Sequence, residues 1–321
     1  MLSTEELLRK AVLDTTDFGG ANEAPLSIHQ VTQFIELMQA EQVMLKDVRV
    51  VTSAANKWQE SIVNFSSRIA KPGTEGSRLD NTAGYERVAP ATDLVELSTV
   101  LIRGEVPVTD EVLEDNVAGS AFVGSLERTI ADRFGIDIEE LMVNGNTASG
   151  DVYLAQFEGW LEQTKNTGNS FDASSYAQDY QEILKQTLIK MPVRYLRGLT
   201  STGRFYVPIR FEQKYRDILA ARGTALGDET LEGARPLRYQ GIPIVGVPSL
   251  DLGITAGSPD TGSILLCAKD NLYAGFHRHM KFETWRDPRE GVTSFVVTAR
   301  VDAKVAIPAA AVCAYTVDVE P

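Results

Sequence analysis

The feature that most constrains the fold of this chain is a polar stretch, residues 71–89, between two strand-like runs. Before it, Val63, Phe65 and Ile69 alternate with polar residues, and a second such run covers 93–103. Period-two alternation is typical of half-buried strands, whereas the stretch itself is rich in residues that favour turns. The pattern predicts a long two-stranded β-ribbon with a polar tip. Such a ribbon is marginally stable alone in water, so we expect another surface to cover it.

The clearest helix is expected to begin at Thr109. This residue is a good N-cap, and Asp110 and Glu111 follow it in the first turn, where the helix dipole favours negative charge. Apolar residues then recur four positions apart, at Phe122, Leu126, Ile130 and Phe134. We expect about 26 helical residues, about 39 Å at 1.5 Å per residue. Gly135 is expected to stop or kink the helix, with 138–143 adding a further turn or two.

The rest of the chain mixes helices and strands. Helices are expected at 3–13, 27–43, 175–191 and 211–219. Ser175 and Gln178 form the cap expected for the third of these helices, and Pro192 ends it. Strands are expected at 48–52, 205–209, 241–247, 263–268, 277–285, 292–301 and 304–317. The fold class is therefore α+β, with a protruding N-terminal arm and the ribbon.

Charge and cysteine content narrow the function classes. The 321 residues carry 31 Lys and Arg against 44 Asp and Glu, a formal net charge of −13. Because nucleic-acid binding through phosphates needs clustered cations, this balance argues against a reader of DNA or RNA. We find no secretory signal and no membrane-length apolar run, and expect a soluble protein made in the cytoplasm. Cys267 and Cys313 lie in apolar runs and are expected to be buried free thiols.

One constellation could carry enzymatic chemistry. On a strand, His277, His279 and Glu283 would point to the same face, and two imidazoles with a carboxylate could hold a catalytic metal with an open position. Lys281 shares that face, which favours a solvated surface instead. No phosphate-binding loop, nucleophile elbow or paired Cys-x-x-Cys motif occurs in the sequence.

Large aromatic residues suggest packing rather than chemistry. Trp58, Trp160 and Trp285 are interpreted as packing anchors, because indole side chains bury a large apolar area.

Short sequence motifs occur along the chain in a recognisable order. They are 97–100 and 106–115, which lead into the long helix, 142–146 with its Asn-Gly turn, 157–161, 191–195, 241–244, 264–266, 270–275 and 300–302. Together with the arm, the ribbon and the long helix, this order resembles the major capsid proteins of tailed bacteriophages, which have the Hong Kong phage capsid fold. The resemblance covers about residues 45–317.

The resemblance implies a division of the chain into parts. These are an N-terminal arm at 1–45, peripheral-domain strands at 46–61 and 93–108, an extended loop at 62–92, a spine helix and turn at 109–145, an axial domain at 146–275, and closing peripheral-domain strands at 276–321.

The resemblance also implies a structural protein without an active site, cofactor or metal. Hexameric and pentameric capsomers would build an icosahedral head shell around the double-stranded DNA of a tailed phage. The partners would be copies of the same chain, with portal, scaffolding and decoration proteins as further candidates and no membrane. The protein would be located in the virion, and in the host bacterial cytoplasm during assembly.

Residues in or near the ribbon are candidates for contacts between subunits. Ordering the ribbon costs about 1–2 kcal/mol per residue, which one subunit cannot offset by burying its own apolar surface. The apolar candidates are Val63, Phe65 and Ile69. The charged candidates are Arg68, Lys71, Glu75, Arg78, Asp80 and Arg87. A surface ion pair contributes only about 0–1 kcal/mol, so the shell would depend on many modest contacts.

Two alternatives stay open at this point. An encapsulin, a bacterial nanocompartment that encloses a cargo enzyme, has a shell of the same fold. A metal-dependent enzyme would use His277, His279 and Glu283. For a phage shell, the acidic balance favours an inner surface that keeps packaged DNA from sticking to the wall.

Overall fold

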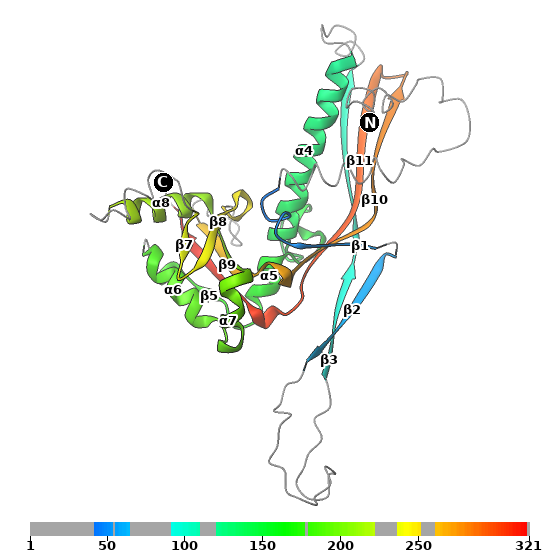
Figure 1. The fold of residues 1–321 in the computed structure, drawn as a ribbon. Helices are drawn as coiled ribbons and strands as arrows, with labels where there is room; N and C mark the ends of the chain where they lie inside the picture. The colour runs from blue at the N-terminus through cyan, green and yellow to red at the C-terminus, as the bar shows by residue number, and fades with distance from the viewer. Residues whose placement is uncertain are drawn as a thin grey trace, which may run out of the picture.

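The computed structural model contains two lobes and a projecting ribbon (Figure 1). The structure describes residues 42–53, 55–64, 91–109, 120–176, 179–221, 236–251 and 261–319, with the backbone alone at 62–64, 91–93, 120–125 and 278–280. The helix expected at 3–13, nearly all of that at 27–43, and the ribbon tip lie outside the described residues. The α+β class predicted from the sequence is confirmed.

A long four-stranded sheet and a long helix form the first lobe. The strands are β1 (Arg49–Ser53), β10 (Leu272–Asp287), β11 (Val292–Val305) and β4 (Val100–Thr109), in the order β1-β10-β11-β4. Strand β1 is parallel to β10, and the other neighbours are antiparallel. Helix α4 (Ser120–Asn144) runs beside the sheet (Figure 1). Phe134 of α4 lies over Gly104 of β4, where an added Cβ would be 3.6 Å from the ring.

Helix α4 confirms the long helix but not its predicted ends. The described helix has 25 residues and runs through Gly135, so the expected stop there is wrong. Ile138, Leu141 and Met142 follow this glycine and are fully buried. Their burial outweighs the roughly 1 kcal/mol that a glycine costs inside a helix. Thr109, the expected N-cap, is the last residue of β4 and pairs with Val292, and 110–119 lie outside the described residues.

The second lobe is built on a six-stranded sheet. Its order is β5-β12-β9-β6-β8-β7, with β5 (Phe171–Asp172), β12 (Ala311–Asp318), β9 (Thr261–Ala268), β6 (Gly203–Val207), β8 (Ile242–Gly246) and β7 (Arg238–Tyr239). Helices α6 (Tyr180–Lys190), α7 (Val193–Thr202) and α8 (Ile209–Ala220) pack around it (Figure 1). Their shared core includes Leu184, Phe205, Phe211, Ile264 and Leu266.

Helix α6 differs from its prediction at the N-terminus. Its cap is Asp179, whose side chain accepts the Glu182 N–H at 3.0 Å. Ser175 instead belongs to a 3₁₀ turn, η4 (Ser174–Tyr176), and Gln178 lies outside the described residues. Aspartate is as strong an N-cap as serine, so the observed cap lies four residues after the predicted one but works by the same hydrogen bond. Helix α7, which directly follows Pro192, was missing from the prediction.

Short elements lie between the larger ones, and several of them are on the connections between the two lobes. They are η3 (Leu154–Gln156), α5 (Trp160–Lys165), η5 (Pro248–Leu250), η6 (Lys269–Asn271) and η7 (Pro308–Ala310). Turn η6 joins β9 to β10, and η7 lies between β11 and β12. Asn271 ties these two crossings together: its Nδ2 donates to the Ile307 carbonyl at 3.0 Å, and its Oδ1 accepts the Ile307 N–H at 2.8 Å.

The strand expected at 304–317 is wrong as a single strand. Strand β11 ends at Val305, and β12 begins at Ala311 after η7, which contains Pro308. Proline has no N–H for a sheet ladder, so the pairing breaks there. Strand β12 then pairs with β9 in the six-stranded sheet. The strands β11 and β12 therefore belong to two different sheets.

Buried residues test the expectations for cysteine and tryptophan. Cys267 and Cys313 are buried and free, as predicted. Burial raises the pKa of both thiols, that of Cys313 to about 12. Trp160 is fully buried, and its Nε1 donates to the Tyr273 carbonyl at 3.2 Å. Trp285 is 61% exposed, so the prediction of a packing anchor is wrong at that position.

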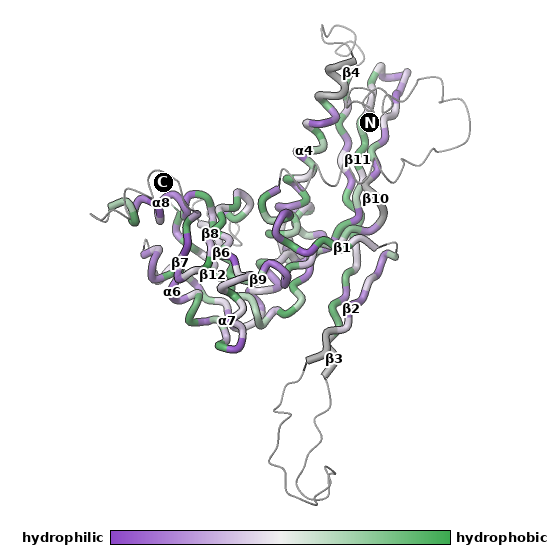
Figure 2. The backbone as a smooth tube through the Cα atoms, in the orientation of Figure 1, coloured by the Kyte–Doolittle hydropathy of each residue, from purple (hydrophilic) through white to green (hydrophobic). Residues whose placement is uncertain are grey.

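Hydrophobic and hydrophilic residues are interleaved along the long strands of the first lobe (Figure 2). This alternation is typical of sheets that bury one face more than the other.

Among the described helices, none combines the length and the apolar character that crossing a bilayer requires.

Candidate assembly site at the root of the ribbon

The ribbon is the two-stranded sheet of β2 (Lys57–Asn64) and β3 (Ala91–Ser98). Its strands are antiparallel, with a register from Lys57↔Ser98 to Asn64↔Ala91. Figure 1 shows it projecting away from both lobes. In the described part of the chain no third strand pairs with it. The outer edges of both strands are therefore open to pairing or to contact with another molecule.

The two faces of the ribbon differ. Val95 and Leu97 share one face and are only 7% and 2% exposed, because this face turns toward the body of the subunit. The opposite face carries Leu94, which is 63% exposed, and Glu96. Lys57 pairs with Glu96 on that face at 3.3 Å. The outward face thus offers one large apolar side chain within a charged surround.

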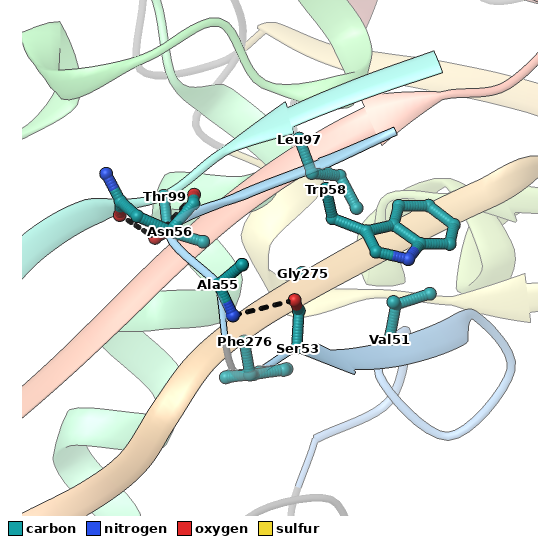
Figure 3. A pocket seen from close by; sticks show the side chains of 9 residues that line it. All are labelled: Val51, Ser53, Ala55, Asn56, Trp58, Leu97, Thr99, Gly275 and Phe276. Carbon is teal, nitrogen blue, oxygen red and sulfur yellow. Dashed lines mark hydrogen bonds between the residues drawn. The ribbon is translucent and has the colours of Figure 1, made fainter. Parts of the chain in front are cut away.

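A close approach seats the ribbon on β10. Leu97 lies against Gly275, where an added Cβ would be 3.2 Å from both methyl groups of the leucine. This spacing is tighter than an ordinary van der Waals contact, so Leu97 would have to shift by a few tenths of an ångström to admit a side chain at position 275. A small cavity beside this contact is lined by Val51, Ser53, Ala55, Asn56, Trp58, Leu97, Thr99, Gly275 and Phe276 (Figure 3).

Asp302 anchors the point where the ribbon leaves the long sheet. This residue of β11 is 3% exposed. Its Oδ2 accepts the Ser98 N–H at 2.6 Å, and its Oδ1 accepts the Ala303 N–H at 2.8 Å. Burial raises the pKa of Asp302, although these N–H groups and Lys304 favour the charged form. The carboxylate therefore fixes the last residue of β3 to a rigid central strand.

A second set of hydrogen bonds closes the root between the two strands. Thr99 Oγ1 donates to Asn56 Oδ1 at 2.7 Å, and the Thr99 N–H donates to the Asn56 carbonyl at 3.3 Å (Figure 3). On the entering strand, the Ala55 N–H donates to Ser53 Oγ at 3.1 Å. Both strands of the ribbon thus leave the body through bonded turns.

An aromatic and charged cluster supports the inner face. The rings of Trp58 and Tyr273 lie 6.3 Å apart. Arg49 stacks over the Tyr273 ring at 4.9 Å, donates to its hydroxyl at 2.6 Å and pairs with Glu60 of the ribbon at 3.4 Å. Cation–π contacts of this kind contribute about 0.5–1 kcal/mol at exposed sites. Trp58 therefore serves as the packing anchor that the sequence predicted.

Of the predicted metal ligands, His277 lies close to this root, whereas Glu283 lies farther along β10, opposite Val296 of β11. His277 is 8% exposed, and its Nδ1 lies 3.0 Å from the Ser53 carbonyl. Glu283 is ion-paired with Lys281, and the register of β10 shifts between His277 and Lys281. The side chain of His279 is outside the described residues. Among the side chains that are described, no three of His, Cys, Asp and Glu are grouped to hold a metal.

Of the nine predicted contact residues, one lies in the part of the chain that the structure describes. Val63 lies in β2, with its backbone alone described, and the other eight fall within 65–90, outside the described residues. Their role in subunit contacts stays a prediction. The residues that form the root, above all Asp302, Gly275 and Tyr273, were not predicted, because their partners lie far away in the sequence.

Solved structures define the class of this fold. The chain is similar to the satellite phage P4 procapsid that includes the size determination (Sid) protein, with a TM-score of 0.62, 14% identity and coverage of 99% and 98% of the two chains. The capsid of a native GTA particle gives a TM-score of 0.58 at 15% identity over 99% and 100%. The holo-SrpI encapsulin complex from Synechococcus elongatus PCC 7942 gives 0.53 at 12% identity over 100% and 98%. The chain has the Hong Kong phage capsid fold, a fold of shell subunits.

Sequence comparison gives the family. Residues 27–315 match the phage capsid family. A protein of Bacillus subtilis (strain 168), YqbE, which is named as a prophage capsid protein, is 31% identical over 310 residues, 94% of each chain. This chain belongs to the phage capsid family and is a structural capsid protein.

Proposed function

We propose that the chain is the repeating subunit of an icosahedral phage head, arranged in hexamers and pentamers around double-stranded DNA. One observation carries this proposal: the ribbon leaves the subunit on a fixed root, with both outer edges unpaired in the described structure and Leu94 turned outward. Another copy of the chain would supply the partners that these edges lack among the described residues. Head-to-tail contacts between copies close into rings when the rotation permits.

Further exposed apolar residues support a shell subunit. Leu101 of β4 is 54% exposed, and Trp285 of β10 is 61% exposed. Single exposed apolar residues are common on monomers, so these two side chains support an interface only together with the open ribbon. We infer that neighbouring copies cover these side chains, and that the protein acts by assembly and not by catalysis.

The partners and the location follow from the same proposal. A head shell needs a portal for DNA entry, and scaffolding and decoration proteins are further candidates for contact. The subunit would be made in the cytoplasm of the host bacterium and end in the virion. The net charge of −13 favours a lumen that does not hold DNA tightly, because phosphates are repelled by acidic surfaces. A basic lumen in the assembled particle would contradict this part of the proposal.

The test is assembly of the full-length protein. Purified protein is followed by sedimentation and electron microscopy, and closed shells are expected. Leu94→Asp should abolish shells while the subunit keeps its circular dichroism spectrum. Val152→Asp is the matched control, because Val152 is 80% exposed on the loop after α4 and receives the same charge. Normal shells from Leu94→Asp would refute the role of the ribbon.

An encapsulin-like compartment is the second candidate, because the encapsulin neighbour covers 100% of this chain. The contents of particles isolated from cells that naturally make the protein separate the two. A phage head contains double-stranded DNA of genome length, whereas a compartment of the encapsulin kind contains an enclosed enzyme. Particles with a stoichiometric enzyme and no DNA would replace the first proposal with the second.

A further inference from the structure

A buried carboxyl group lies where the chain enters the first lobe. Glu139 of α4 is 3% exposed, and the backbone N–H groups of residues 43–45 donate hydrogen bonds to it. Residues 43–47 form a turn directly after 1–41, the part of the chain outside the described residues. The carboxyl group therefore connects the C-terminal part of helix α4 to the turn at 43–47.

The turn is docked in the core as well as bonded to Glu139. Met44 and Leu45 are 0% and 1% exposed and belong to the same apolar cluster as Ile138 and Leu141 of α4. The Val48 N–H donates to the Met44 carbonyl at 3.1 Å, which holds the turn in shape. Opening this contact would expose the apolar side chains and the carboxyl group together.

One oxygen of Glu139 has no donor. Its Oε2 is buried without a hydrogen-bond partner, so the N–H groups of the turn are left to the other oxygen. A buried and unpaired carboxylate oxygen is costly in its charged form and is the natural place for a proton. Burial accordingly raises the pKa of Glu139 to about 7, against smaller opposite effects of the N–H groups and Lys46.

In the part of the chain that the structure describes, few charged groups lie around Glu139. Lys46, on the turn, is the charged group that acts on it. Asp47 of the same turn is paired with Arg204 of β6 at 3.6 Å. On α4 itself, Asp137 is paired with Arg133 at 2.9 Å. The acidic neighbour Glu140 has its own raised pKa through burial and through Asp137.

We propose that Glu139 is a proton-sensitive latch that fastens the turn after residues 1–41 to the spine helix. Protonation of the unpaired oxygen removes a buried charge and favours the closed latch. Loss of the proton favours an open state in which the carboxylate reaches water. By linkage, the state that binds the proton more tightly is favoured at low pH, so the open fraction rises with pH. The rise is at most about tenfold per pH unit between the ordinary and the raised pKa.

Hydrogen exchange of the full-length subunit tests the latch. The exchange rates of the amides of residues 43–45 are measured from about pH 5 to about pH 8 and divided by their intrinsic rates, which gives the open fraction. We expect this fraction to rise by more than tenfold in the wild type. In Glu139→Gln, which imitates the protonated group, it should stay low and flat. Asp132→Asn, also on α4, removes an equal charge and should behave as the wild type.

Each outcome decides the proposal. Parallel pH profiles in the wild type and Glu139→Gln would overturn it, as would an open fraction that falls as pH rises. If Glu139→Gln does not fold, the wild-type profile still decides, compared with amides of β9 as an internal reference. The latch belongs to the subunit alone, so its failure would leave the proposed shell function intact.

Discussion

Asp302 and Ser98, which are 204 positions apart in the sequence, are joined by a hydrogen bond of 2.6 Å from the Ser98 N–H to Asp302 Oδ2. Asp302→Ala leaves the buried N–H of Ala303 and the part-buried N–H of Ser98 without this acceptor. The free energy of unfolding should fall by about 1–3 kcal/mol, the cost of unsatisfied buried donors. Urea unfolding of the subunit measures it. An unchanged midpoint would mean that water replaces the carboxylate.

The pH dependence of the same residue has a definite sign. Burial raises the pKa of Asp302 above its unfolded value, so the folded state binds the proton more tightly. Its stabilising contribution is then fully present below the unfolded pKa and is lost as pH rises through the folded pKa. The unfolding free energy of the wild type minus that of Asp302→Asn should therefore fall as pH rises from about 4. A difference that grows over this range would contradict the assignment.

The contact of Leu97 with Gly275 predicts a steric effect. Gly275→Ala places a methyl group 3.2 Å from both Leu97 methyls and should destabilise the subunit by about 1–3 kcal/mol. Adding Leu97→Val should recover part of the loss. Gly150→Ala is the control, because nothing lies within 4 Å of the added carbon there. Thermal unfolding of the four proteins measures the effect, and equal melting temperatures would refute the close packing.

Replacing each of two tryptophans by alanine should affect the stability of the subunit to very different extents. Trp160→Ala removes a fully buried ring and should cost about 3–5 kcal/mol of stability. Trp285→Ala removes a ring that is 61% exposed and should change subunit stability by about 0.5 kcal/mol or less. Assembly should nevertheless decline in Trp285→Ala, as measured by sedimentation of shells. Full assembly in this variant would place Trp285 outside any interface.

The two cysteines should be silent in the folded protein. Both thiols are buried, and their raised pKa values keep them protonated. A colourless disulfide reagent that reports free thiols should show no reaction in native subunits, and complete reaction in urea. Rapid labelling of native protein would indicate that β9 and β12 separate in solution.

Local patterns predicted the elements that local chemistry determines. The alternation around Val63 indicated the ribbon, and the four-residue spacing up to Phe134 indicated the long helix. The ribbon begins earlier than expected, at Lys57, because the residues around Trp58 and Glu60 show no clean alternation of polarity. Gly135 was misjudged because a propensity ignores the packing on both of its sides.

The candidate site was mostly beyond prediction. Its contacts join Ser98 to Asp302 and Leu97 to Gly275, pairs that no local spacing relates. The motifs at 270–275 and 300–302 were noted for their resemblance to the family, but nothing in them indicated a role. The sheet to which residues 311–318 belong could not be predicted either, because their apolar sequence fits both sheets equally well. Only the fold brings these residues together.

The pair of crossings held by Asn271 has a mechanical consequence. The two antiparallel connections are joined through the buried side-chain amide of Asn271. The junction between the two sheets therefore resists twisting more than a single connection would. A force applied to the six-stranded sheet is therefore expected to move both lobes together, so that the isolated subunit behaves as one body at this junction.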